Sequence, residues 1–266
     1  MIYRYIMLII FTLLSFEVVA RETKEQKRAH THNLRTWLQL VDFTYDDHNL
    51  PQALKLKRIE EMDKFFELIA VKLTKKKEAK LRTLYKAYRS GDSFERVRQI
   101  ELRSTAIKFF RVITLPAQKP DFALGEKLYK EYCASCHGVK GAGDGIFTRN
   151  PELPMVPAPK DLRAQYDLGT RSPYSYFNTL MIGSDGTAMK SYDKSMKSHD
   201  LWSLAFYMSS AWRDDQPEDP KERFTLEDIS TMTNLELRER IGKEKTEGKL
   251  WHLRRISSFL GTTPRK

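Results

Sequence analysis

The chain has 266 residues, of which 41% are hydrophobic and 30% are charged. This composition supplies enough apolar material for packed cores but is too polar for a protein that spans a membrane many times. The formal net charge is +11, and residues 21–118 hold 22 Lys and Arg against 13 Asp and Glu. The excess suits docking to an acidic partner or to an anionic membrane surface, although a solvated helical face is the simpler interpretation. No nucleic-acid-binding motif accompanies it, so we expect no nucleic acid as a partner.

The first twenty residues have the features of an export signal. Arg4 supplies a positive charge, residues 6–16 form an apolar stretch, and Val18-Val19-Ala20 is a small-residue cleavage site. We therefore expect a signal peptide over residues 1–20 and a periplasmic location. An uncleaved membrane anchor is the alternative, because the apolar stretch falls only just short of a membrane span.

Residues 31–114 have helical periodicity throughout, because apolar residues return every three or four positions and glycine is nearly absent. Breaks at 49–51 and 90–93 divide the pattern, and short connections favour antiparallel neighbours. The sequence therefore predicts a four-helix antiparallel bundle over residues 21–118. The residues predicted to face its interior are Leu34, Trp37, Leu38, Val41 and Tyr45; Leu56, Ile59, Phe66 and Ile69; Leu81, Leu84, Tyr85 and Tyr88; and Phe94, Val97, Ile100, Ile107 and Phe110, with Phe109 or Arg111 flanking.

A proline-containing linker over residues 116–120 ends this pattern, and a second domain is expected over residues 119–212. It begins with a predicted helix over 122–132 and closes with one over 199–212. The fold class is therefore all-α. A helical tail follows over 213–266, with short helical patterns at 226–232 and 235–241 and a last apolar stripe of Trp251, Leu253, Ile256 and Phe259.

Two cysteines and a histidine form the pattern Cys133-Ala134-Ser135-Cys136-His137, which is the attachment motif of c-type haem. Thiols three positions apart at a helix end can each add to one haem vinyl group, and the adjacent histidine then lies under the iron as an axial ligand. A redox dithiol does not need the histidine, and a zinc site needs further paired ligands that the sequence lacks. We therefore predict one covalent haem c on Cys133, Cys136 and His137.

A methionine opposite the histidine is the second axial ligand that raises the reduction potential of electron carriers. Met189 is our candidate, because it follows Gly186-Thr187-Ala188 in a segment without strong helical period, after a helix that starts at Ser172-Pro173. Met196 and Met181 are the alternatives. Met208 lies in an apolar helix and is expected in the core, and Met155 comes early in a proline-rich stretch.

Residues 122–212 resemble a class I cytochrome c. The resemblance rests on Gly125, Tyr129, the haem motif, Gly141-x-Gly143-Asp144-Gly145, Pro157-x-Pro159, Gly-Thr-Ala-Met189 and Trp202-x-x-x-x-Tyr207. It implies that the first and last helices cross at Gly125, and that the carbonyl of Pro157 or Pro159 orients His137. It also implies single-electron transfer to redox partner proteins, and no enzymatic activity. The glycine run lacks the strand and the Gly-Lys-Ser/Thr of a phosphate loop, so we interpret it as turns at the haem edge.

The chain also resembles the periplasmic region of bacterial cytochrome c/high-affinity iron permease fusion proteins. Three segments carry this likeness: Leu40-Val41-Asp42-Phe43 with Asp47; Arg171-Ser172-Pro173-Tyr174 with Met189 and Trp202-Ser-Leu-Ala-Phe-Tyr207; and Thr225 to Leu237. The permease's membrane helices are absent from this sequence. The resemblance therefore implies a stand-alone redox subunit that works beside a separate iron permease or a respiratory-chain component.

Several acidic residues in the bundle are candidate metal ligands, because hard oxygen donors suit iron and other divalent metals. An ordinary solvated acidic edge is the alternative, and His30-x-His32 is a weaker metal candidate. Two further functions stay open: a haem-containing docking or metal-sensing module for a membrane transporter, and a haem enzyme such as a peroxidase, which needs an open iron position. The acidic candidates and their neighbouring histidine are Asp42, Asp47, His48, Glu60, Glu61 and Asp63.

Overall fold

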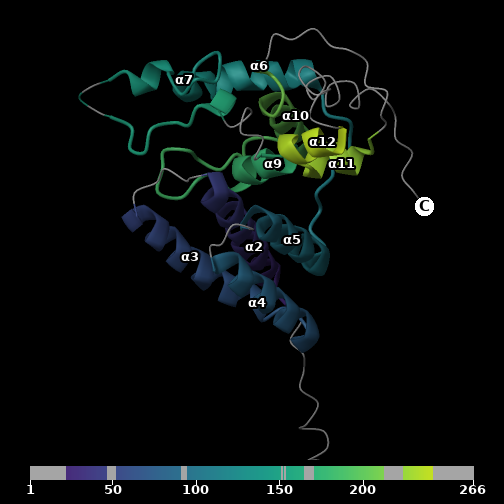
Figure 1. Ribbon diagram of the computed structural model, residues 1–266. Helices are drawn as coiled ribbons and strands as arrows, with labels where there is room; N and C mark the ends of the chain where they lie inside the picture. The colour runs from purple at the N-terminus through teal and green to yellow at the C-terminus, as the bar shows by residue number, and fades with distance from the viewer. Residues whose placement is uncertain are drawn as a thin grey trace, which may run out of the picture.

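The computed structural model describes residues 22–46, 52–90, 95–150, 152, 154–164, 171–212 and 224–241. Every regular element within these residues is a helix, which confirms the predicted all-α fold. The expected signal peptide and the apolar stripe near the C-terminus lie outside them. Figure 1 shows two layers, with one group of helices (α2 to α5) below a second group formed by the rest of the described chain.

The lower group is a bundle of helices α2 (Lys24–Asp46), α3 (Gln52–Ala70), α4 (Lys75–Arg89) and α5 (Glu95–Phe110). α2 packs against α3 and α5, and α4 packs against α5. The centre of its core is aromatic: the rings of Phe66 and Tyr85 stack with centroids 4.4 Å apart, and Trp37 meets them at 5.7 and 5.9 Å. Rings in these offset and edge-on arrangements stabilise a core beyond the area that they bury.

Part of the predicted bundle interior is wrong. Leu56 is 54% exposed and Val97 is 63% exposed. Residues Gln99, Leu102, Arg103 and Ala106 form the buried face of α5, and the predicted Ile107 and Phe110 pack half-buried against the same core. The buried face of α5 includes polar residues, because they find polar partners on other helices. Apolar periodicity alone therefore does not identify this face. The side chains of Tyr45 and Phe94 lie outside the described residues.

The upper group begins with helices α6 (Phe122–Tyr132) and α7 (Ala134–His137) and the 3₁₀ turn η1 (Ile146–Thr148), and continues with α9 (Pro173–Ile182) and α10 (Ser198–Met208). α6 crosses α10 at Gly125, where a Cβ atom would press on Ser203 O and lie 2.8 Å from Tyr207 Cβ. Glycine permits this approach, as predicted. α10 ends at residue 208 rather than 212, because the hydroxyl groups of Ser209 and Ser210 bond back to Phe206 O.

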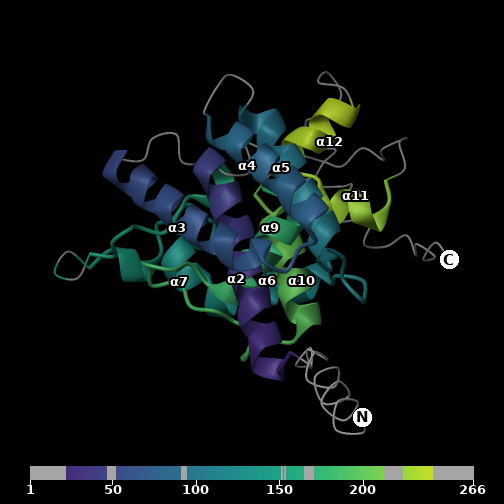
Figure 2. The ribbon, with the colours of Figure 1, turned by 90° about the horizontal axis from the view of Figure 1, so that it is seen from below.

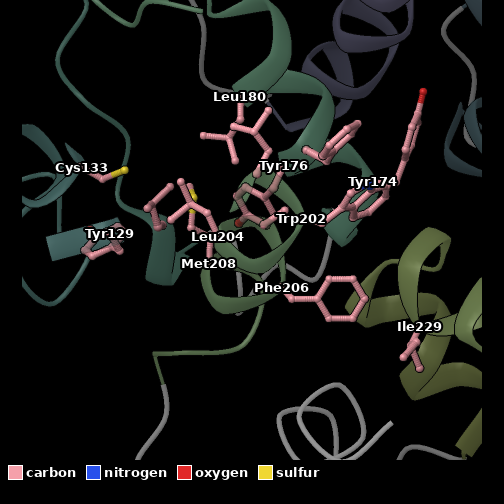
Figure 3. Packing of buried hydrophobic residues seen from close by; sticks show 14 of the residues in the cluster. Tyr129, Cys133, Tyr174, Tyr176, Leu180, Trp202, Leu204, Phe206, Met208 and Ile229 are labelled. Atoms are coloured by element: carbon pink, nitrogen blue, oxygen red, sulfur yellow. The ribbon is translucent and has the colours of Figure 1, made fainter. Parts of the chain in front are cut away.

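Two short helices complete the upper group, α11 (Leu226–Thr231) and α12 (Asn234–Ile241), within one residue of the predicted bounds. Thr225 starts α11 with a reciprocal capping box to Asp228. Ile229 and Leu237 belong to the same core as Trp202 and Cys133. Figure 3 shows this core running from Tyr129 and Cys133 at one end, past Trp202, to Phe206 and Ile229 at the other.

The two groups meet along a buried interface between α2 and α9. Figure 2, seen from the bundle side, shows α2 lying across the upper group next to α9. The contacts are polar on both sides: Asp42 and Gln39 of α2 bond to Ser175 and Thr179 of α9. Buried polar groups must find such partners, so the interface fixes one orientation of the two groups.

Candidate functional site

The two cysteines lie on one turn of helix that follows α6 directly. Cys133 ends α6 and begins α7, with its N–H donating to Tyr129 O and its carbonyl accepting from the N–H of His137. Both thiols are free; Cys133 is buried and Cys136 is half-buried. Burial, together with Cys136, raises the pKa of Cys133 to about 12. A buried thiol that stays protonated is a poor redox nucleophile, which argues against the dithiol interpretation.

His137 ends α7 with its ring held in one orientation. Its Nδ1 lies 3.1 Å from Lys160 O, and because a carbonyl only accepts, Nδ1 carries the proton. Burial lowers the pKa of His137 although the Lys160 hydrogen bond opposes this. The ring is therefore neutral at neutral pH, and its Nε2 lone pair is available to a metal.

The carbonyl that orients His137 differs from the one predicted. It belongs to Lys160, so the assignment to Pro157 or Pro159 was wrong. The carbonyl of Pro159 faces Gly143 instead, where a Cβ atom would come within 2.5 Å of it. The loop takes this register because its next residues are anchored by a 2.7 Å bond from the N–H of Leu162 to Gly141 O.

Tyr129 stabilises the helical turn that carries the two cysteines and His137. Its hydroxyl donates to Gly138 O at 2.7 Å, and its ring lies 5.6 Å from Tyr207 and 5.0 Å from Trp212. Burial raises the pKa of Tyr129, so the hydroxyl remains a donor. This bond joins the core to the residue that immediately follows His137.

Met189 lies in the loop between α9 and α10 and is half-buried. Its N–H donates to Thr187 Oγ1 at 3.1 Å, its carbonyl accepts from Ser184 N–H at 3.0 Å, and it packs on the core that contains Cys133. Met181 and Met196 pack in the same core, so all three candidate methionines lie against the same group of buried residues. Met208 is 3% exposed and is a core residue, as predicted.

Tyr192 brings this loop onto the cysteine-bearing turn. Burial, with Cys133, Cys136 and Tyr132 nearby, raises the pKa of Tyr192 to about 12. Its hydroxyl donates to Tyr132 O at 3.4 Å. The sequence reasoning missed both Tyr192 and Lys160. An aromatic residue three positions after the candidate methionine, in an otherwise polar loop, is a signal that points to Tyr192.

Within the described residues, the bundle candidates for metal ligands do not form a cluster. Asp63 is bound by Arg89 at 2.7 Å and by the Tyr85 hydroxyl at 2.6 Å, and the described part of the chain has no group of three or more His, Cys, Asp or Glu that could hold a metal ion. His30 and His32 lie two positions apart on α2, a spacing that points them in different directions. Asp47 and His48 lie outside the described residues.

Residues 122–212 match the family model described as Cytochrome c. This part of the chain is a cytochrome c domain. The match runs from the first residue of α6 through α10 and includes all four predicted site residues. The chain has no match among the curated proteins and none among the solved structures.

A cytochrome c domain implies a covalently bound haem c, and the residues present fit this group. Two free thiols stand three positions apart on one helical turn, and the next residue is a buried neutral imidazole with Nε2 unused by its Lys160 contact. Cys133 and Cys136 would hold the porphyrin, and His137 would bind its iron. When bound, the haem supplies a centre that gains and loses one electron.

Proposed function

We propose that this protein is a periplasmic monohaem cytochrome that passes single electrons through a haem bound axially by His137 and Met189. The observation that carries the proposal is the Lys160 carbonyl, which holds the proton on Nδ1 of His137 and so leaves the Nε2 lone pair free to bind the iron. Methionine opposite histidine raises the reduction potential and closes the sixth iron position. A closed position favours electron transfer over peroxidase chemistry.

Three features of the loop support Met189 as the sulfur ligand. Its backbone is bonded on both sides, by Thr187 and Ser184. The same loop contacts the cysteine turn through Tyr192. Its side chain is half-buried, which suits a group that reaches from the loop toward a cofactor, whereas Met196 is 9% exposed and already packed in the core.

We further propose that the cytochrome serves oxidative iron uptake beside a separate iron permease, accepting one electron as each ferrous ion is oxidised to ferric iron. The three segments that resemble the permease fusion proteins support this, because they meet at one buried junction. Asp42 of the first accepts from Ser175, which directly follows the Arg171–Tyr174 motif, and Arg103 pairs with both Asp42 and Glu236 of the third. This junction connects the bundle, the cytochrome c domain and α12 into one structural unit.

A basic end of the bundle supports association with an anionic membrane surface. Glu22, before α2, pairs with Lys72 at 2.8 Å, and Lys77 lies over the ring of Phe109 near the end of α5, so the start of α2, the α3–α4 corner and the end of α5 are neighbours. Cations outnumber acids here, and Val71 beside them is 71% exposed. None of the helices in the described ranges is long and apolar enough to cross a membrane. We define this basic end as Lys24, Lys27, Arg28, Lys72, Lys75, Lys76, Lys77 and Lys80.

Replacement of the candidate ligand tests the proposed function. Ferric haem with a methionine sulfur ligand has a weak long-wavelength absorbance band, and Met189→Ala should lose it, bind carbon monoxide rapidly when reduced, and have a lower midpoint potential. Met181→Leu and Met196→Leu are the controls and should keep the band. A band that survives in Met189→Ala but disappears in either control would assign the ligand elsewhere. Mixing the oxidised wild type with ferrous iron tests the iron role, because a haem that stays oxidised would reject it.

A further inference from the structure

The loop that carries Met189 begins at a residue held by the helical bundle. Gly183 ends α9 with a φ of 78°, and its carbonyl accepts a 2.8 Å hydrogen bond from Gln39 Nε2 of α2. The same amide group donates to Thr179 Oγ1 at 3.3 Å. Gln39 is 5% exposed, so both bonds lie away from water. A buried amide with its two hydrogens used in this way fixes the end of α9.

Gly183 in turn is packed against the backbone of Met189. A Cβ atom at Gly183 would lie 2.8 Å from Met189 O and 2.8 Å from Ser191 N. The N–H of the next residue, Ser184, donates to Met189 O at 3.0 Å. The contact therefore passes from Gln39 to Gly183 and from there to the backbone of the candidate ligand.

Further contacts between α2 and α9 hold the same faces of the two helices together. Arg35 Nη1 donates to Asn178 Oδ1 at 3.0 Å, and Asn178 Nδ2 donates back to Arg35 O at 2.8 Å. The guanidinium of Arg35 also lies over the ring of Phe177 at 5.5 Å. Residues 35, 39 and 42 of α2 and residues 175, 178 and 179 of α9 have helical spacing, so each set forms one face. The bundle holds α9 along its length and not at one point.

We infer that Gln39 is a positioning residue through which the helical bundle holds the Met189 loop against the haem iron. The inference rests on the proposed His137 and Met189 ligation. It gives the bundle a role in electron transfer itself: the bundle keeps the sulfur on the iron and keeps other ligands off. Without the Gln39 amide, the carbonyl of Gly183 is buried without that donor, and the loop gains freedom to move away.

Two variants disrupt the contact that runs from Gln39 through Gly183 to the Met189 backbone, one in the bundle and one at the end of α9. Gln39→Leu removes the donor at similar size, and Gly183→Ala forces a Cβ atom against Met189 O at a positive φ. Each has a matched control. Gln99→Leu removes another buried glutamine amide that donates to a backbone carbonyl, Val41 O at 2.9 Å, but inside the bundle. Gly186→Ala introduces the same strain at a φ of 73°, with nothing within 4 Å of the new atom.

Carbon monoxide binding to the reduced holoprotein is the measurement, because carbon monoxide enters only when the sulfur leaves the iron. Loss of one buried hydrogen bond should raise the open fraction, and with it the binding rate, about tenfold in Gln39→Leu. Gly183→Ala should behave alike, with a weaker long-wavelength band in the ferric state. Gln99→Leu should match the wild type, and Gly186→Ala, which strains the same loop without the clash, should accelerate binding less than Gly183→Ala does. Circular dichroism identifies any variant that does not fold, and the other variant then decides.

The outcomes separate this inference from the proposed function. If the wild type has the sulfur band but the properly folded variants bind carbon monoxide at the wild-type rate, the inference is wrong and the ligation stands. Equal acceleration in Gln39→Leu and Gln99→Leu would also overturn it, because general loosening of the bundle would then explain the effect. A wild type without the sulfur band would overturn both.

Discussion

The hydroxyl of Ser175 in α9 donates a 2.7 Å hydrogen bond to Asp42 in α2, although 133 positions separate the two residues. The other carboxylate oxygen of Asp42 lies 3.5 Å from Arg103 of α5. Arg103 also lies 3.3 Å from Glu236 of α12. One buried cation therefore lies between two carboxylates from different parts of the chain. The ion pair with Glu236 joins the bundle to α12, and the hydrogen bond from Ser175 to Asp42 joins it to the cytochrome c domain.

Replacement of Arg103 by methionine should destabilise the whole protein. Burial alone would lower the pKa of Arg103, but Asp42 and Glu236 raise it above its ordinary value, so the side chain is charged at every working pH. Its removal leaves Asp42, which is 4% exposed, as a buried carboxylate without its cation. Breaking such a pair costs about 3–5 kcal/mol. Urea unfolding followed by circular dichroism measures the free energy of unfolding.

Arg82→Met is the matched control for that measurement. Arg82 also pairs with two carboxylates, Glu67 and Glu78, but its side chain is 35% exposed. Exposed ion pairs contribute about 1 kcal/mol or less. Equal losses of unfolding free energy in the two variants would show that burial of the Arg103 ion pairs adds nothing to stability.

Local sequence signals predicted the elements that carry the haem site. α6 spans Phe122–Tyr132 as expected, because Asp121 caps it with hydrogen bonds to two backbone N–H groups and an apolar stripe follows. The haem motif was equally readable, since its residues are adjacent in the chain. The serine cap of α9 at Ser172, with proline in the first turn, was also correct.

Contacts between segments that lie far apart in the chain could not be predicted from the sequence. Gln99 and Arg103 are polar, and their burial is favourable because α2 offers the Val41 carbonyl to Gln99 and the Asp42 carboxylate to Arg103. Part of the inner face of α5 was misplaced for this reason. The choice of Lys160 over Pro159 as partner of His137 depends on how the loop is anchored to Gly141, a register that composition does not reveal.

Replacement of Gly125 by alanine should destabilise the cytochrome c domain. Alanine favours the helical conformation over glycine by about 1 kcal/mol, so without tertiary contacts the change would stabilise α6. The new methyl group would instead press on Ser203 O and Tyr207 Cβ of α10. Overpacking of this kind costs about 1–3 kcal/mol. Thermal unfolding of the holoprotein measures the difference.

The control on the same helix is Ala123→Gly, at an exposed position. It reports helix propensity alone and should cost no more than about 1 kcal/mol. If Gly125→Ala proves more stable than the wild type, α6 and α10 do not cross as closely at this residue as the structure has it.

The basic end of the bundle should bind anionic vesicles. Each lysine or arginine near an anionic surface contributes about 1 kcal/mol of attraction, which falls off within about 10 Å at moderate salt. The double variant Lys75→Glu and Lys76→Glu should therefore co-sediment much less with vesicles of phosphatidylglycerol and phosphatidylcholine than the wild type does. High salt should release the wild type as well.

The same charge change on the far side of the molecule separates a local surface from net charge. Lys127 and Lys140 are exposed on the cytochrome c domain, which lies at the opposite side from the basic end (Figure 1). Lys127→Glu with Lys140→Glu alters the net charge equally and should leave most of the binding intact. If both double variants lose binding to the same degree, the attraction follows the net charge of +11 and the bundle end has no special role.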